Sequence, residues 1–280
     1  MSLLIPKSFS YFFTSSQNLN NQAKNVSSDG SSFSVQLASP IQIPRGAVAC
    51  TLEVTQASVW NNMFNISAQI GNNQFRYDPA GAGYTTLTIP DGQYSLSALN
   101  DVLAAHFVAE ALDEDYIQIG ADEPTQKAVL IFKVAATLVD FREGVNSCRD
   151  VLGFNAREVT APVNNHPELG DDVAKFNRVN SLLIKTNLIG NGIPVNNKSN
   201  GVIASIPISE APGTLIVYNP PHPITADATS LVGGVNNYFS FWLLDQEERP
   251  VDTNGESYSF VVVIKYFLLM TNENVPMSNI

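Results

Sequence analysis

Short runs of apolar residues, separated by Gly, Asn and Pro, recur along most of the 280-residue chain. About ten of these runs have the length or the alternation of β-strands, whereas one segment has the period of an α-helix. Strands at this spacing favour a β-sandwich or a barrel. The pattern therefore predicts an all-β fold, a sandwich or a barrel, with one substantial helix.

Three pairs of runs predict hairpins or tight turns between strands. The pairs are Phe64–Ile70 with Gln74–Tyr77, Tyr116–Ile119 with Ala128–Val134, and Tyr238–Leu244 with Tyr258–Leu269. In the last pair, Asn254-Gly255 is expected to form a hairpin turn. The strand at Tyr258–Tyr266 alternates little between apolar and polar residues, which is expected of a strand that is buried on both faces.

One segment predicts a helix. Ser95 is a good N-cap, and Leu96, Leu99, Leu103 and Phe107 follow at helical spacing. No residue that breaks helices lies between Asp101 and His106.

Four aromatic residues, Phe9, Tyr11, Phe12 and Phe13, stand close together near the N-terminus. They are followed by a stretch rich in Ser and Asn, which cannot form a core of its own. We expect residues 1–30 to form an extended arm whose aromatic patch contacts a partner. The alternative is a strand that folds onto its own domain. Residues 31–280 are expected to form one domain.

The composition excludes some classes of partner. Charged residues make up 15% of the chain, compared with roughly 25% in ordinary soluble domains. The net charge is −11 and the 15 Lys and Arg residues form no cluster, which argues against direct nucleic-acid binding. The surface must therefore be neutral and polar, or covered by partners. The apolar run Phe260–Met270 is too short for a membrane span and contains Lys265.

No group of residues predicts catalysis or metal binding. The three histidines, His106, His166 and His222, belong to no motif. The acidic clusters at Asp113–Asp115 and Asp171-Asp172 are expected in solvated loops, and Asp252–Glu256 begins too late for a calcium loop. Cys50 and Cys148 are expected to be buried, reduced and apolar in character. We expect no catalytic, cofactor-binding or metal-binding residue, no cofactor, and no enzyme activity.

Two stretches of the chain resemble the penton proteins of polinton-like viruses, virophages and their relatives. The first begins at Ile89-Pro90-Asp91-Gly92-Gln93-Tyr94, continues through the helix and the hairpin that ends near Phe132, and closes with Val151-Leu152-Gly153-Phe154. The second contains Ser181–Ile189, Val202–Ile208, Ile216–Pro221, Phe241–Gln246 and Asn254-Gly255-Glu256. Together the stretches cover rather more than half the chain.

The resemblance implies a single jelly-roll β-sandwich in residues 31–280, with a helix-hairpin insertion at about 90–154. It implies a structural virion protein, assembled in the host cell, that forms a pentamer at the five-fold vertices of an icosahedral DNA virus capsid. The implied partners are copies of the chain, the major capsid protein and minor capsid proteins. The N-terminal third matches no pattern of the family, and the chain has no Arg-Gly-Asp loop, so host attachment is not implied.

Two alternatives remain open. The first is another jelly-roll virion component, such as a minor capsid, cement or spike-base protein, which would differ in its number of copies. The second is a carbohydrate-binding sandwich module, in which Trp60 and Trp242 would stack on sugars. Both tryptophans lie in expected strands, which favours a core position for them.

Overall fold

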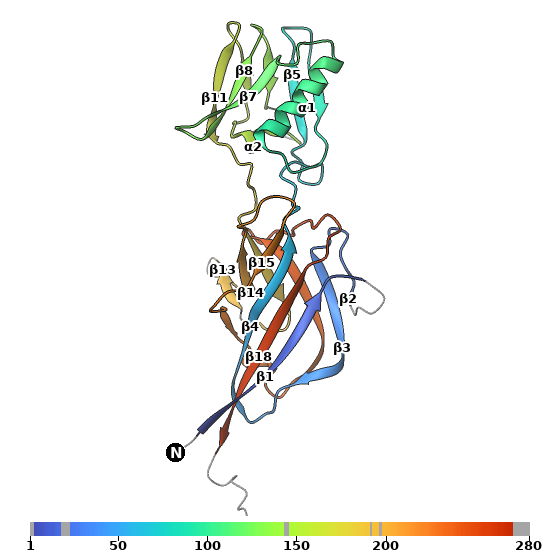
Figure 1. Ribbon diagram of the computed structural model, residues 1–280, viewed down its shortest axis with the longest axis vertical. Coiled ribbons are helices and arrows are strands. Elements are labelled where there is room, and N and C mark those ends of the chain that lie inside the picture. Colours follow the sequence, from blue (N-terminus) through green and yellow to red (C-terminus); the bar gives the residue numbers. More distant parts are fainter. Residues whose placement is uncertain (1–2, 18–22, 143–145, 191, 196–197, 271–280) are drawn as a thin grey trace, which may run out of the picture. The chain divides into compact units, whose positions relative to one another are not determined.

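The computed structural model describes the chain except residues 1–2, 18–22, 143–145, 191, 196–197 and 271–280. The chain divides into two compact units. Residues 1–63 and 179–280 form the first, which we call the jelly-roll unit. Residues 64–178 form the second, which we call the inserted unit (Figure 1). The predicted insertion at about 90–154 lies inside the inserted unit.

The jelly-roll unit consists of two antiparallel sheets. Sheet A has the strand order β1-β18-β4-β15, and β16 also pairs with β4. Its strands are β1 (Leu3–Thr14), β4 (Ala47–Trp60), β15 (Leu215–Tyr218), β16 (Thr225–Asp227) and β18 (Ser259–Met270). Sheet B has the order β13-β14-β12-β17-β3-β2. Its strands are β2 (Ala23–Lys24), β3 (Ser32–Gln42), β12 (Ser181–Thr186), β13 (Ile193–Val195), β14 (Lys198–Pro207) and β17 (Val235–Asp245), and a 3-10 helix, η1, spans Thr229–Leu231.

The order of the longer strands identifies the topology. In chain order these strands are β1, β3, β4, β12, β14, β15, β17 and β18. If these eight strands are numbered in chain order, sheet A contains the first, eighth, third and sixth strands, side by side in that order. The main path of sheet B contains the second, seventh, fourth and fifth strands. Two interlocked four-stranded sheets of this order are a jelly roll, formed from two Greek keys. The prediction of an all-β single jelly roll is confirmed.

The core of the jelly-roll unit lies between the two sheets and is rich in aromatic rings. Phe13 of β1 and Phe260 of β18 meet Phe33 and Phe241 of sheet B, and all four are buried. The Phe13 and Phe241 ring centroids are 4.7 Å apart, and those of Phe33 and Phe241 are 5.4 Å apart. Because side chains alternate along a strand, every second residue of β3 and β18 reaches this layer.

The inserted unit packs two further sheets and two helices around its own core. One sheet has the order β10-β9-β5-β6, with β5 (Gln74–Asp78), β6 (Thr85–Thr88), β9 (Leu138–Asp140) and β10 (Glu158–Thr160). The other has the order β11-β8-β7, with β7 (Ile117–Asp122), β8 (Lys127–Phe132) and β11 (His166–Val173). The helices are α1 (Leu96–Ala109) and α2 (Arg149–Leu152).

The predicted helix is confirmed as α1. The Ser95 hydroxyl accepts a hydrogen bond from the backbone N–H of Ala98 at 3.1 Å, which is the expected N-cap geometry. Leu99, Leu103 and Phe107 are buried on its inner face. The predicted hairpin between Tyr116–Ile119 and Ala128–Val134 is also confirmed, because β7 pairs with β8 in antiparallel register.

Two of the predicted hairpins are wrong. Residues 64–70 form no strand, because the Asn72 side chain bonds the N–H of Ser67 at 2.9 Å and the carbonyl of Asn65 at 2.7 Å, which holds this segment in a turn. The strands on either side of Asn254-Gly255 lie in different sheets, β17 in sheet B and β18 in sheet A. This turn therefore crosses between the sheets, and it does not close a hairpin.

The segment predicted as an arm, residues 1–30, contributes β1 to sheet A. All twelve residues from Leu3 to Thr14 pair with β18. Residues 1–2 and 18–22 of the segment lie outside the described residues.

The two cysteines are buried and free, as predicted, with Cys50 in the jelly-roll core and Cys148 in the core of the inserted unit. Burial, with a smaller contribution from the charge of Asp227, raises the pKa of the Cys50 thiol to about 11. Burial raises the pKa of Cys148 to about 12. Both thiols are therefore protonated and unreactive near neutral pH.

Adjacent residues of β1 should differ sharply in their effect on stability. Phe13→Ala removes a ring from the aromatic core and should lower the free energy of unfolding of the jelly-roll unit by roughly 3–5 kcal/mol. Phe12→Ala, one residue away on the opposite side of the strand, should change it by about 0.5 kcal/mol or less. Urea unfolding followed by aromatic fluorescence measures both. Equal losses would show that β1 is not packed as described.

Candidate partner-contact surface

The four aromatic residues of the predicted patch do not share one face. Phe13 is buried and Tyr11 stacks on it, with ring centroids 6.0 Å apart. Phe9 stacks on Tyr266 at 5.6 Å and is partly exposed. These three rings therefore pack against the jelly-roll unit of their own chain. Phe12 points to the other side of β1 and is 68% exposed. The partner contact predicted for the four residues stays a prediction, and Phe12 is the one most available for it.

Phe12 belongs to the side of sheet A that faces away from the core, which we call the A face. Cross-strand partners share a face, and Phe12 pairs with Val261, Leu4 with Leu269, and Leu215 with Trp60. The exposed large apolar side chains of the A face are Leu4, Phe12, Trp60, Leu215, Val217 and Leu269, and partly exposed Val261, Val263 and Phe267 lie among them.

An outer sheet face of this kind is unusual. An antiparallel sheet with one face on the core normally presents polar side chains on the other face. In β18, however, Val261, Val263 and Phe267 point outward, while Phe260, Val262 and Ile264 fill the core. The weak alternation of this segment is thus explained by two apolar faces, and the single chain covers one of them.

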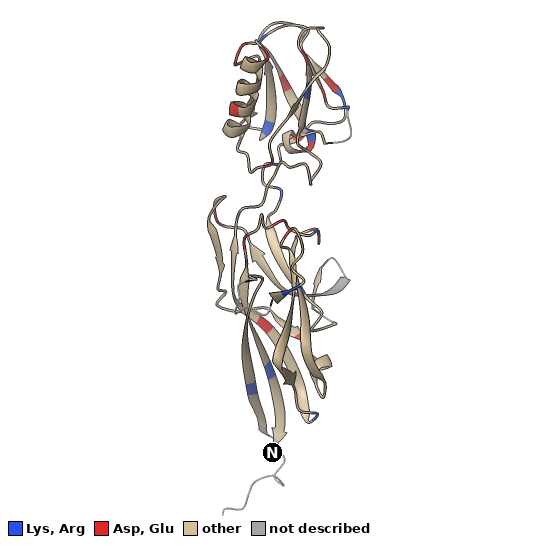
Figure 2. Cartoon of the chain, turned by 90° about the vertical axis from the view of Figure 1, so that its right-hand side faces the viewer, with Lys and Arg blue, Asp and Glu red and all other residues tan. Residues whose placement is uncertain are grey.

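The A face is almost free of uncompensated charge. Its centre holds Lys265, whose Nζ lies 2.5 Å from Oε1 of Glu53. Glu53 is only 8% exposed. Asp227, on the short strand β16, accepts hydrogen bonds from the hydroxyl and the N–H of Thr229, which lower the pKa of its carboxyl. Figure 2 shows how few charged residues the long strands of the jelly-roll unit carry.

The corresponding outer side of sheet B, which we call the B face, is mostly polar and carries few charges, Lys24 among them. The Ser34 and Ser240 hydroxyls lie 3.0 Å apart. Tyr238 is exposed, and its hydroxyl accepts a hydrogen bond from Nδ2 of Asn25 at 3.2 Å. Hydrogen bonds from Ser34 and Asn25 lower the pKa of Tyr238.

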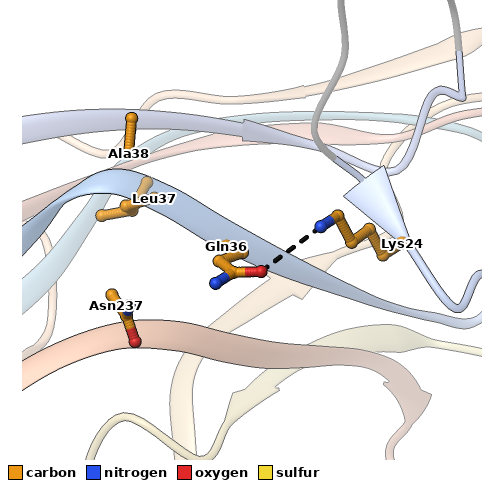
Figure 3. A pocket seen from close by; sticks show the side chains of 5 residues that line it. All are labelled: Lys24, Gln36, Leu37, Ala38 and Asn237. Atoms are coloured by element: carbon orange, nitrogen blue, oxygen red, sulfur yellow. Dashed lines mark hydrogen bonds between the residues drawn. The ribbon is translucent and has the colours of Figure 1, made fainter.

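The B face contains a shallow hollow of about 460 Å³ (Figure 3). It is lined by Lys24, Gln36, Leu37, Ala38 and Asn237. The Lys24 ammonium donates a hydrogen bond to Oε1 of Gln36 at 3.3 Å across one end of the hollow. Ala38 and Leu37 supply the apolar part of its lining, and Leu37 also packs against the jelly-roll core.

The two tryptophans are not brought together. Trp60 is 40% exposed on the A face, beside Leu215. Trp242 is half-buried and packs against a small apolar cluster that includes Leu183, Val202 and Leu244. They therefore do not form one stacking platform for a sugar.

Six of the titratable residues singled out in the sequence make local contacts. Asp113 and Asp115 both contact the Lys133 ammonium, at 3.3 Å and 2.5 Å, and Oδ2 of Asp171 lies 3.1 Å from Nε of Arg157. His106 bonds the Tyr77 hydroxyl at 3.1 Å, and His166 bonds Glu168 at 2.9 Å. Asp252 caps its own turn by accepting from the N–H of Asn254.

Over the described residues, no group of three or more His, Cys, Asp or Glu side chains is placed to hold a metal ion. Within the same residues, no helix is both long enough and apolar enough to cross a bilayer.

The sequence reasoning missed most of the A face. It singled out Phe12 by its aromatic neighbours but gave no role to Val217, Val261 or Val263. The signal that could have found the last two was the weak alternation of Tyr258–Tyr266.

Comparison with known proteins supports the fold. No family model matches the sequence, and no curated protein matches it. Among solved structures, the chain is similar to the crystal structure of the mavirus penton protein, with a TM-score of 0.50 and 10% sequence identity. The similarity covers 95% of this chain and 100% of that one. At this identity the likeness shows a shared jelly-roll architecture.

Asp140 is the most enclosed carboxylate of the charged network in the inserted unit, and it should make folding depend on pH. Its burial acts to raise the pKa, but hydrogen bonds from Arg142 and the positive charges of Arg142 and Arg76 outweigh burial, and the pKa of Asp140 is lowered. A carboxyl with a depressed folded pKa contributes stability above its unfolded pKa, and this stability is lost as the pH falls through the folded value.

Asp140→Asn should therefore lower the unfolding free energy of the inserted unit by roughly 1–3 kcal/mol at pH 7, and the difference should shrink as the solution is acidified. Asp150→Asn is the matched control, because Asp150 is 80% exposed beside Arg149 and such pairs contribute little. Urea unfolding across the acid range measures both variants. A loss that does not change with pH would mean that Asp140 acts through its shape alone.

Proposed function

We propose that this chain is a structural virion protein that forms a pentamer at the five-fold vertices of an icosahedral DNA virus capsid. Its partners in this role are copies of itself, the major capsid protein and minor capsid proteins. The observation that carries the proposal is the A face, a broad apolar surface on the outer side of a jelly roll that one chain leaves uncovered.

The fold supports a building role. Jelly rolls recur in viral capsids, although lectins and other proteins also use them. Exposed apolar surfaces of this extent mark places where another molecule packs. The structural similarity to the mavirus penton protein, which extends over 95% of this chain, also supports a building role.

The distribution of charge supports the same role. The jelly-roll unit carries 7 Lys and Arg and 10 Asp and Glu, giving a net charge of −3. The inserted unit, although shorter, carries 8 and 16, giving −8. Depletion of charge is typical of surfaces that become covered in assemblies. We therefore propose that the jelly-roll unit forms the shell contacts, and that the inserted unit is a separate insertion with a more hydrated surface.

A second structural candidate, a minor capsid, cement or spike-base protein, would use the same apolar face with a different number of copies. A catalytic role has no specific support from the side chains described above. A sugar-binding module gains no support either, since the two tryptophans lie apart.

Native mass spectrometry of the full chain should give a mass about five times the 30.3 kDa of one chain at micromolar concentration. Ring closure by repeated head-to-tail contacts stops at a fixed number of copies. Trimers or dimers would favour the second candidate. A chain that stays monomeric at all concentrations, in the presence and absence of the major capsid protein, would refute the proposal.

Assembly should also strengthen with salt. Each chain carries a net charge of −11, so neighbouring copies repel, and added salt screens this repulsion. The protein concentration at which half of the chains are associated, measured by light scattering, should decrease when NaCl is raised from about 20 to about 150 mM. An increase in this concentration would mean that ion pairs between copies dominate the contact.

A further inference from the structure

We infer that the A face of one copy packs on the B face of the next, with the ring of Phe12 seated in the hollow beside Leu37 and Ala38. This inference rests on the proposed function and names the contact that would close the ring. Four features carry it: the size of the A face, the symmetry of a ring, the low number of charges on both faces, and the match between a protruding ring and a hollow.

The A face is large enough for a stable contact. Strands β1 and β18 have twelve residues each, β4 has fourteen and β15 has four. At about 3.4 Å per residue and about 4.8 Å between strands, they form a face of roughly 700 Å². This area is close to the roughly 800 Å² that each partner contributes to a standard protein interface.

Symmetry decides what the A face can meet. Two A faces packed on each other form an isologous contact, which closes with two copies. A ring of five needs a heterologous contact, in which the A face meets a different surface of the next copy. In a two-layer sandwich the B face is the surface on the opposite side, so successive copies can continue in the same sense around the ring.

Charge permits this contact. Lys265 and Glu53 neutralise each other at the centre of the A face, so covering it leaves no unpaired charge at that point. On the B face, the serine hydroxyls and Tyr238 are uncharged, and Lys24, whose ammonium bonds the neutral Gln36 amide, is a cation at the rim of the hollow. The acidic groups that would repel a neighbour are concentrated in the inserted unit.

Shape supplies the register. Phe12 has the largest exposed fraction, 68%, among the exposed large apolar side chains of the described residues. The hollow on the B face has apolar lining from Leu37 and Ala38, and Lys24 at its rim can lie near the face of an aromatic ring. An aromatic ring placed in a pocket of its neighbour is a common anchor of protein interfaces.

A disulfide between neighbouring copies tests the contact. The double variant Phe12→Cys with Ala38→Cys places one thiol on each face. The two sheets are about 10 Å apart, whereas a disulfide needs Cα atoms within about 7 Å, so the bond cannot form within one chain. The native Cys50 and Cys148 are buried and do not compete. Oxidation should give a ladder of covalent oligomers that ends at five on non-reducing gels.

Each single-cysteine variant is a matched control and should stay monomeric on the gel. Covalent dimers from Phe12→Cys alone would mean that two A faces meet, which overturns the inference. A ring of five that forms in native mass spectrometry but yields no ladder would also overturn it, while leaving the proposed function intact. If no ring forms at all, both the inferred contact and the proposed function are refuted.

A charge substitution gives an independent measurement. Phe12→Asp would place a carboxylate in the apolar part of the hollow and should raise the concentration needed for ring formation at least tenfold. Val108→Asp on α1 of the inserted unit, which is 59% exposed, should leave that concentration unchanged. Circular dichroism of both variants shows whether the fold is kept. A folded Phe12→Asp variant with unchanged assembly would contradict the contact.

Discussion

The jelly-roll unit depends on β18, a strand that is apolar on both sides. It pairs with β1 on one edge and with β4 on the other, and its inward residues complete the aromatic core. Its outward residues, Val261 and Val263 among them, form the middle of the A face. The same strand therefore stabilises the single chain and leaves a surface whose apolar area is still in contact with water. Covering that area is the favourable free-energy change that we expect to drive assembly.

The proposed assembly would also account for the division of charge between the two units. A surface that packs on neighbours cannot carry many ions, because each buried charge needs a partner. The inserted unit carries most of the net charge. Lys265 and Glu53 show how one ion pair can remain at the centre of an apolar face.

The sequence predicted the fold class well, because strand periodicity and turn residues are local signals. Ser95 and the apolar spacing after it located α1, and the β7–β8 hairpin followed from its turn. The errors arose where tertiary contacts decide. Asn254-Gly255 forms a turn whether it closes a hairpin or connects two sheets. Only the pairing of β17 and β18 in different sheets shows that it connects them. Residues 64–70 have strand composition, but the Asn72 amide holds them in a turn. Most of the A face was missed because it requires the register of β1 and β15 against their neighbours, and only its part in β18 had a local signal, the weak alternation of Tyr258–Tyr266.

The central claim is that the A face is covered in the assembled state. Hydroxyl-radical footprinting tests it directly, since oxidation of a side chain reports its contact with water. The account predicts that Phe12, Val261 and Val263 are labelled in the dilute chain and protected in the assembly, while exposed Val108 of the inserted unit is labelled equally in both. Equal labelling of the A face in the two states would contradict it.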